Sequence, residues 1–324
     1  MKAESAIEYL VEKAIKLDKF SIARLVSLFE KEPSEPLNRE EIHKQKQKVM
    51  ELLRAQKVDR AFIAGVTGPP GAGKSTLVGA LANRIIATED FSLAIVAVDP
   101  SSHISGGALL GDRTRVNMPL DENRLYFRSQ ASELNLGGLG RHTFSIVNIL
   151  SFLFDYVLVE TVGIGQNEIE IRNLADKSFL VVQPFSGDQV QFLKAGVMEV
   201  PDAFIINKCD EESLAQKSYY QLKSSLGFLN IPAHDGPPIF MTSATSGRGI
   251  EELAGYLISI RSQKRSLDEK AQYFISKAIE RGFGEFGLDI FRANFESYDN
   301  QKSYEENLQV FLALINGKIN QETR

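Results

Sequence analysis

The sequence predicts an α/β protein with an open, doubly wound and mostly parallel sheet and with helical extensions at both ends. Short apolar runs recur between residues 58 and 262 and alternate with helical segments. Such runs are typical of strands that are buried on both faces and joined by crossover helices. Outside these bounds, apolar residues recur at helical spacing. We therefore expect an N-terminal helical extension (1–57), a central domain (58–262) and a C-terminal helical arm (263–324).

The N-terminal extension carries apolar residues at helical spacing, including Ile22, Leu25 and Val26. Two prolines within residues 32–36 are expected to end one helix, and Asn38 is placed to cap the next. The first residues include several glutamates and no long apolar stretch. We therefore expect neither a signal peptide nor a transit peptide.

Apolar runs in the central domain define seven expected strands. These are residues 61–67, 93–98, 125–129, 156–160, 178–183, 203–207 and 239–243. The apolar stretch 144–162 also invites a membrane assignment, but Asn148, Asp155 and Glu160 interrupt it. Because a charged residue at the centre of a bilayer costs about 2.5–3.5 kcal/mol, we expect a helix followed by a strand there and no membrane span.

Beyond residue 262 the pattern is helical again. Apolar side chains recur around Phe274 and around Phe311, and Gly282, Gly284 and Gly287 between them predict a bend.

Composition narrows the class of partner. The chain has 37 basic and 42 acidic residues and a net charge of −5, so nucleic acid is not expected as its main partner. One cysteine, Cys209, and four scattered histidines form neither an internal disulfide nor a zinc cage. This cysteine usage predicts a cytoplasmic location.

The strongest motif is the segment 68–76, GPPGAGKST, which follows the first expected strand and opens a helix. Its glycines let phosphates approach the backbone N–H groups closely. Lys74 is expected to reach the β- and γ-phosphates, and the Ser75 hydroxyl to bind Mg²⁺. The motif predicts a P-loop NTPase fold. The expected phosphate contacts are Gly68, Pro69, Gly71, Ala72, Gly73, Lys74, Ser75 and Thr76.

A second motif identifies the base. Asn207, Lys208 and Asp210 form an NKxD pattern at the end of an expected strand. The aspartate carboxylate of this pattern accepts hydrogen bonds from guanine N1–H and the exocyclic amine, which adenine does not offer in that geometry. The nucleotide is therefore expected to be GTP or GDP. Ser243, Ala244 and Thr245 follow a later strand and are expected to contact the guanine.

Three acidic residues between these motifs are candidates for holding Mg²⁺ together with Ser75. Asp99 and Glu160 end expected strands, and Asp112 lies in a loop. Mg²⁺ prefers hard oxygen ligands, and carboxylates at strand ends can complete its shell. We expect Lys74, Asp99, Asp112 and Glu160 to serve hydrolysis. For two of these residues a purely structural role explains the sequence equally well. Asp99 could be a turn or cap residue, and Asp112 a solvated loop acid.

Several further strings carry a family resemblance. They are VDPSS (98–102), GGALLGDRTR (106–115), LGGLGR (136–141), ETVGIGQ (160–166) and GDQVQFLKAG (187–196). With them the chain resembles the MeaB/ArgK/MMAA GTPases, chaperones of adenosylcobalamin-dependent acyl-CoA mutases, chiefly methylmalonyl-CoA mutase. Residues 18–32 and 303–317 resemble the family's terminal helices, so the resemblance covers nearly the whole chain.

The resemblance implies a homodimer held by the C-terminal arm and a GTP-driven switch that gates adenosylcobalamin delivery to the mutase and helps to remove damaged cofactor. It implies a switch role for Arg115 and a partner-relay role for Gln191 and Lys194 in a mobile loop. That loop departs from the family pattern at Gln189 and Phe192. These departures affect the expected identity of the partner and the coupling to it, and they leave the expected nucleotide chemistry unchanged.

Hydrolysis is expected to be slow without the partner, because no glutamine immediately follows Gly163. Arg113 or Arg115 could stabilise the developing charge. Other functions remain open at this point. A nickel-insertion GTPase would need a cluster of cysteines or histidines, and this sequence has one cysteine and four scattered histidines. An ATP-dependent kinase linked to basic amino-acid transport would have no use for the NKxD motif, which selects guanine. A non-catalytic GTP-binding scaffold would bind GTP without turning it over.

Overall fold

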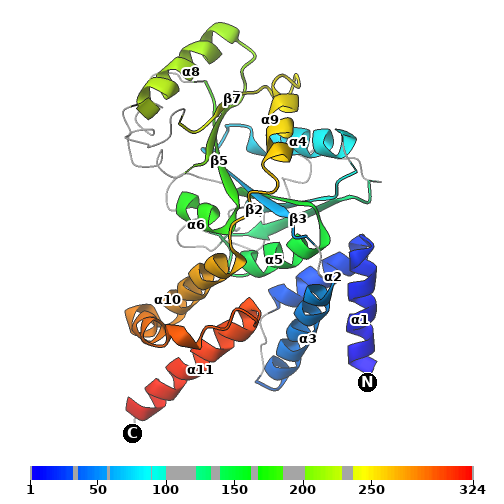
Figure 1. Cartoon of the computed structure of the whole chain (residues 1–324), viewed down its shortest axis with the longest axis vertical. Helices are drawn as coiled ribbons and strands as arrows, with labels where there is room; N and C mark the ends of the chain where they lie inside the picture. Colours follow the sequence, from blue (N-terminus) through cyan, green and yellow to red (C-terminus); the bar gives the residue numbers. More distant parts are fainter. Residues whose placement is uncertain are drawn as a thin grey trace, which may run out of the picture. The chain divides into compact units, whose positions relative to one another are not determined.

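The computed structural model shows the fold of most of the chain (Figure 1). It describes residues 2–31, 36–56, 59–88, 90–99, 122–132, 139–161, 167–184, 201–227 and 236–322. Residue contacts divide the chain into two compact units. The helical unit comprises residues 1–59, 141–153 and 265–324, and the sheet unit comprises residues 60–140 and 154–264.

The described strands of the sheet unit form one seven-stranded sheet. They are β1 (Phe62–Thr67), β2 (Leu93–Asp99), β3 (Leu125–Ala131), β4 (Tyr156–Thr161), β5 (Lys177–Val182), β6 (Ala203–Ile206) and β7 (Ile239–Met241). Their order is β3-β2-β4-β1-β5-β6-β7, and every pairing is parallel. The predicted doubly wound sheet is confirmed, with β1 at its centre.

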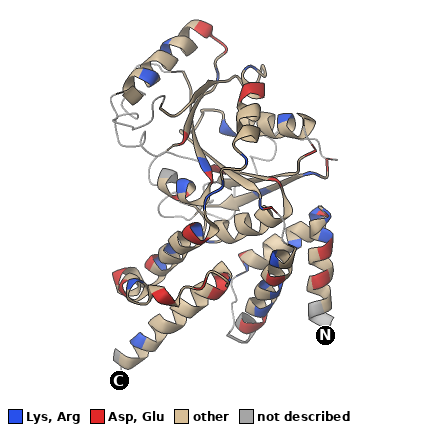
Figure 2. Cartoon of the chain, in the orientation of Figure 1, with Lys and Arg blue, Asp and Glu red and all other residues tan. Residues whose placement is uncertain are grey.

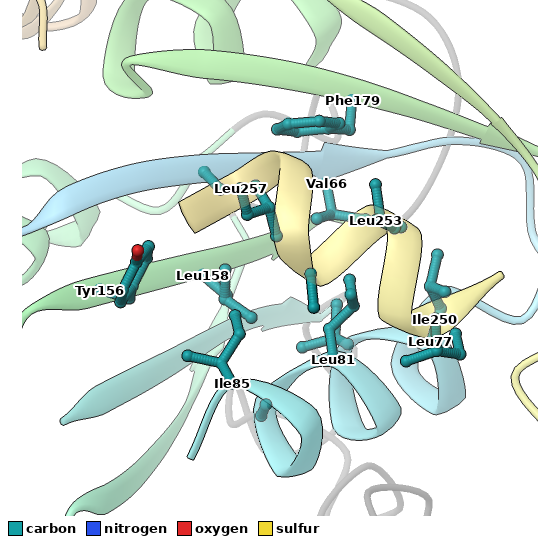
Figure 3. Close-up of a cluster of buried hydrophobic side chains, with 14 of the residues drawn as sticks. Val66, Leu77, Leu81, Ile85, Tyr156, Leu158, Phe179, Ile250, Leu253 and Leu257 are labelled. Atoms are coloured by element: carbon teal, nitrogen blue, oxygen red, sulfur yellow. The ribbon is translucent and has the colours of Figure 1, made fainter. Parts of the chain in front are cut away.

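Helices of the sheet unit cover the sheet with apolar faces. They are α4 (Lys74–Thr88), α6 (Asn167–Leu174), α8 (Glu212–Gly227) and α9 (Ile250–Ser259). Leu77, Leu81 and Ile85 lie four residues apart on one face of α4 and pack with Leu253 and Leu257 of α9 (Figure 3). Each such side chain contributes about 1.5–3 kcal/mol when fully buried. This core holds the start of α4 close to the end of β1.

The described helices of the helical unit come from distant parts of the sequence. They are α1 (Lys2–Ile15), α2 (Lys19–Glu30), α3 (Pro36–Ala55), α5 (Thr143–Leu153), α10 (Leu267–Ala293), the 3₁₀ helix η3 (Phe295–Ser297) and α11 (Tyr304–Glu322). The prediction that Asn38 caps a helix is wrong, because α3 already begins at Pro36. Proline is tolerated in the first turn of a helix, where its missing N–H has no intrahelical partner.

Within the apolar stretch, residues 144–153 belong to α5 and residues 156–161 form β4, as predicted. Within the described ranges, no helix is long and apolar enough to cross a membrane. The predicted glycine bend is also present, because Gly284 has non-helical dihedral angles (φ 59°, ψ −150°) inside α10. Both acidic and basic side chains occur on α1 and on α3 (Figure 2).

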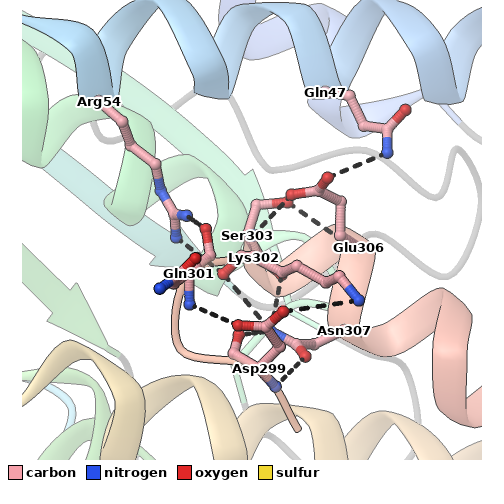
Figure 4. Close-up of polar contacts among 8 residues, drawn as sticks. All are labelled: Gln47, Arg54, Asp299, Gln301, Lys302, Ser303, Glu306 and Asn307. Carbon is pink, nitrogen blue, oxygen red and sulfur yellow. Dashed lines mark hydrogen bonds and ion pairs between the residues drawn. The ribbon is translucent and has the colours of Figure 1, made fainter. Parts of the chain in front are cut away.

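Aromatic packing and a polar network hold the helical unit together. Phe144 of α5 stacks on Phe274 of α10, with ring centroids 4.9 Å apart, and lies 4.7 Å from the Tyr304 ring of α11. Arg54 of α3 donates to the backbone carbonyls of Gln301 and Lys302 at 2.6 and 2.9 Å (Figure 4). These contacts join the N-terminal helices to the C-terminal arm.

Candidate nucleotide site

The phosphate loop connects the central strand β1 to α4. Gly68, Gly71 and Gly73 have φ of 147°, 80° and 82°, a region that side chains disfavour. A Cβ atom at Gly68 would lie 2.0 Å from the carbonyl oxygen of Val181 on β5, so no side chain fits there. At Gly71 no described atom lies within 4 Å of such a Cβ. The backbone is therefore shaped to let an anion approach closely.

Lys74 supplies the positive charge of this loop. Its Nζ donates to the carbonyl oxygens of Gly68 and Pro69 at 2.8 and 3.0 Å, and the residue is 5 % exposed. Lys74 is also the first residue of α4, whose N-terminus carries the positive end of the helix dipole. An amine and a helix N-terminus are both groups that can contact phosphate oxygens, and phosphate binding by the segment 68–76 stays a prediction.

Ser75 and Glu160, two of the four residues predicted to hold Mg²⁺, lie in direct contact. Ser75 Oγ donates to Glu160 Oε1 at 2.7 Å, and Glu160 is 3 % exposed. Parallel pairing of β1 with β4 sets Val66 beside Glu160 and so brings the carboxylate to the phosphate loop. A hydroxyl and a carboxylate at the start of α4 are the donor types that Mg²⁺ selects, so these two residues fit that ion.

Other predicted site residues are described only in part. The backbone of Asp99 ends β2, which pairs with β4, while its side chain lies outside the described residues. Asp112, Arg115, Gln191 and Lys194 also lie outside them. Their roles remain predictions.

Asn207 links the phosphate loop to the loops that follow β6 and β7. Its Nδ2 donates to the carbonyl oxygens of Ala72 and Gly73 at 2.9 and 3.3 Å. Its Oδ1 accepts from Thr242 Oγ1 at 3.1 Å and from the Ala244 backbone N–H at 3.2 Å. Asn207 is 1 % exposed. This buried amide therefore fixes the phosphate loop and the base-binding loops relative to each other.

Asp210 is oriented by the loop after β7. Ser243 Oγ donates to Asp210 Oδ1 at 2.6 Å and lies 3.2 Å from Thr245 Oγ1. Asp210 itself is exposed, so a ligand can reach its carboxylate. Lys208 has a φ of 63°, and its Nζ lies 3.5 Å from Gln183 Oε1. The structure thus brings the NKxD motif and the predicted segment 243–245 together.

Two further residues of this site were not predicted. Arg248 donates to the Cys209 carbonyl at 3.3 Å and to Glu212 Oε1 at 3.2 Å, which joins the loop after β7 to the one after β6. Thr242 holds Asn207, as described above. The sequence near Arg248 gives only a weak signal for this contact, namely the neighbouring glycine. In the structure that glycine, Gly247, lies in a tight turn with a φ of 79°.

Cys209 is buried between these loops. Burial raises the pKa of its thiol above the usual range, and Sγ lies 3.1 Å from the Ile206 carbonyl oxygen. A thiol in this state is a packing residue and a poor nucleophile.

Comparison with known proteins agrees with this geometry. The family described as "Methylmalonyl Co-A mutase-associated GTPase MeaB" matches residues 22–273. A putative GTPase of Pyrococcus abyssi is 38 % identical over 253 residues, which is 76 % of this chain and 74 % of that protein. The GTPase ArgK of Escherichia coli is 31 % identical over 263 residues, 80 % of this chain and 78 % of its own length.

Two other similar proteins extend the comparison. The mitochondrial methylmalonic aciduria type A homolog of Mus musculus is 35 % identical over 216 residues, 64 % of this chain and 52 % of its own length. A solved structure titled LAO/AO transport system kinase superimposes with a TM-score of 0.61 and 20 % identity, covering 95 % of this chain and 98 % of that one. At that identity the structural likeness concerns the fold alone.

Proposed function

The chain belongs to the MeaB family of methylmalonyl-CoA mutase-associated GTPases, and we propose that its GTP cycle gates adenosylcobalamin loading into an acyl-CoA mutase of the methylmalonyl-CoA mutase type. In this proposal it also protects that mutase. The family match over residues 22–273, which includes the entire nucleotide site, is the observation that carries the proposal. The mouse relative's name, which refers to methylmalonic aciduria, gives further support.

Hydrolysis requires that the negative charge of the γ-phosphate be neutralised and that a water molecule be aligned. Lys74 and the N-terminus of α4 supply positive charge at the phosphate loop. Ser75 and Glu160 would hold Mg²⁺, which when bound neutralises charge on the β- and γ-phosphates. We propose that hydrolysis is slow until the mutase binds, because no glutamine immediately follows Gly163 in the sequence.

Base selection depends on Asp210. Its carboxylate, oriented by Ser243, would accept two hydrogen bonds from guanine. Adenine offers no matching donors, so ATP would gain neither of these two hydrogen bonds. GTP selectivity distinguishes the proposal from an ATP-dependent kinase.

We further propose that the segments 99–115, 160–168 and 187–196 order on the γ-phosphate and relax after hydrolysis. To invert a conformational equilibrium from 1:99 to 99:1, the two nucleotide states must differ by about 5.5 kcal/mol in their preference. In the proposal the protein is a cytoplasmic homodimer held by the arm 263–324, and this dimer presents the mutase-binding surface.

The proposal is tested with the full chain and a purified adenosylcobalamin-dependent acyl-CoA mutase. Phosphate release from GTP is measured with and without mutase, and association is measured with GDP and with a non-hydrolysable GTP analogue. We expect faster turnover with mutase and nucleotide-dependent association. The matched control is Ser75→Ala, which should still be a folded protein but should show no mutase-stimulated turnover. Unchanged turnover together with no association would refute the chaperone role and leave the GTPase activity intact.

A further inference from the structure

A cavity away from the nucleotide site lies within the helical unit, and none of its lining residues belongs to the sheet unit. It has a volume of about 350 Å³, within the range of small-molecule sites. Its walls come from α2, α3, α10 and α11 and from the start of α5. We propose that this cavity binds a small amphipathic anion, with an oxyanion head group such as a carboxylate on an apolar body.

One part of the wall is apolar. Ile42 of α3 and Ala278 of α10 line the cavity together with Leu308 and Leu312 of α11. Leu308 and Leu312 are four residues apart and so lie on one face of α11. This surface would take the apolar body of the ligand, because burying it removes hydrocarbon from water.

Another part of the wall is cationic. Lys46 of α3, Arg281 of α10 and Arg141 line the same cavity. Lys46 Nζ lies 3.2 Å from the Phe29 carbonyl oxygen and 5.5 Å from the Phe29 ring centroid, which holds the amine at the end of α2. Burial lowers the pKa of His43, so this lining residue adds no charge at neutral pH. Three cations from three segments favour an anionic head group.

Glu305 provides the second, independent indication of a ligand. Glu305 Oε1 accepts from Ser145 Oγ at 2.7 Å, and the residue is 8 % exposed. Its Oε2 is buried without a hydrogen-bond partner among the described residues, although Glu305 lines the cavity. Because a buried polar atom without a partner is costly, a ligand atom at this position would relieve that cost.

The first turn of α11 holds Glu305 in place. Ser303 Oγ accepts from the Glu306 backbone N–H at 3.2 Å, and Glu306 Oε2 accepts from the Ser303 N–H at 2.7 Å, a capping box. Burial raises the pKa of Glu305 above the usual range. A protonated carboxyl group can donate a hydrogen bond to an anion, and the raised pKa favours that form, so this acid is compatible with the proposed ligand.

The test uses hexanoate and hexyl phosphate as probes, with hexan-1-ol and hexylammonium as matched neutral and cationic controls. Binding to the full chain is measured by saturation-transfer NMR and titration. We expect at least one anionic probe to bind about tenfold more tightly than either control. Arg281→Gln should weaken that binding about tenfold. Ala278→Leu, which fills the cavity, should abolish it.

The control variant is Arg292→Gln, which removes the same charge from α10 but lies outside the cavity and pairs with Glu285 and Asp289. It should leave probe binding unchanged. Thermal unfolding and basal GTP turnover verify that each variant is folded. The proposal is overturned if neither anion binds, if hexan-1-ol binds as tightly as the anions, or if folded Arg281→Gln and Ala278→Leu proteins bind them normally.

Discussion

Ser75 Oγ donates a hydrogen bond to Glu160 Oε1 at 2.7 Å, joining the first turn of α4 to the end of β4. The two residues are 85 positions apart, and only the parallel pairing of β1 with β4 brings them together. The pair places a hydroxyl and a carboxylate beside the phosphate loop.

Ser75→Ala should lower Mg²⁺-dependent GTP hydrolysis on the order of 100-fold, because it removes one oxygen ligand of the ion. Steady-state phosphate release at varied Mg²⁺ measures the effect. GDP binding in the presence of a chelator should change little. Ser259→Ala on α9 is the matched control, since the Ser259 hydroxyl donates only to the nearby Tyr256 carbonyl and is exposed. Wild-type rates in Ser75→Ala would contradict the assigned metal site.

Asp210→Asn should change the base preference. The variant loses a charged acceptor for guanine N1–H and the exocyclic amine, so GTP affinity should fall roughly 100-fold. The upper limit of the effect is about 1.5–3 kcal/mol for each charge-assisted hydrogen bond that is lost. Xanthosine triphosphate, which carries an acceptor in place of that amine, should gain affinity. Fluorescent-nucleotide displacement measures both. The control is Glu211→Gln, which should keep the GTP preference, because Glu211 is an adjacent exposed acid that accepts from the Ser213 hydroxyl. Equal GTP affinity in Asp210→Asn would exclude this base-binding role.

Asn207→Ala should destabilise the sheet unit and weaken GTP binding together. The change leaves the Thr242 hydroxyl and the Ala244 N–H without their buried acceptor. The expected loss in the free energy of unfolding is about 1–3 kcal/mol, measured by urea denaturation with and without GTP. Asn173→Ala is the control, because the partly exposed Asn173 side chain donates only to the Ile169 carbonyl of its own helix among the hydrogen bonds of the described residues. A similar loss in both variants would show that Asn207 has no special linking role.

Two neighbouring acids should give opposite pH dependences of stability. Burial raises the pKa of Glu305, so the folded state keeps a proton that the unfolded chain releases above its usual pKa of about 4.5. The contribution of Glu305 to stability is therefore lost as the pH rises through its raised pKa. As the pH rises through that pKa, Glu305→Gln should therefore become more stable relative to wild type. Midpoints of urea denaturation measure the difference.

Glu306 is the matched control for this titration. Burial opposes ionisation of Glu306, but hydrogen bonds from Ser303 outweigh it, and the pKa of Glu306 is lowered. Its contribution is present above the usual pKa and lost as the pH falls through the lowered one. Glu306→Gln should therefore be less stable than wild type near neutral pH, and this difference in the free energy of unfolding should shrink as the pH falls. Midpoint differences of the same sign for both variants would show that the two environments are wrongly assigned.

Local patterns predicted most of the sheet unit. The segment 68–76 combines glycines at required positions with a strand before it and a helix after it. The seven apolar runs were confirmed as strands because parallel strands buried on both faces leave a continuous apolar signature. Asn38 was assigned wrongly because Pro36 can itself start a helix, and both residues are compatible with a helix N-terminus.

The contacts that were not predicted join residues far apart in the sequence. Arg248 reaches the Cys209 carbonyl, and the Asn207 amide reaches the phosphate loop 135 residues away. Neither contact has a local pattern, since each depends on which strands lie side by side. The grouping of α5 with the terminal helices is of the same kind, because α5 lies between β3 and β4 in the chain.

By itself, the sequence determined that this protein binds a guanine nucleotide through a phosphate loop, because glycine geometry and the NKxD carboxylate act over a few adjacent residues. Tertiary structure alone decided that Ser75 meets Glu160, that Asn207 couples the two loops, and that Glu305 is buried beside a cavity. Burial, hydrogen-bond partners and pKa depend on the elements that surround a side chain, and those elements come from distant parts of the chain.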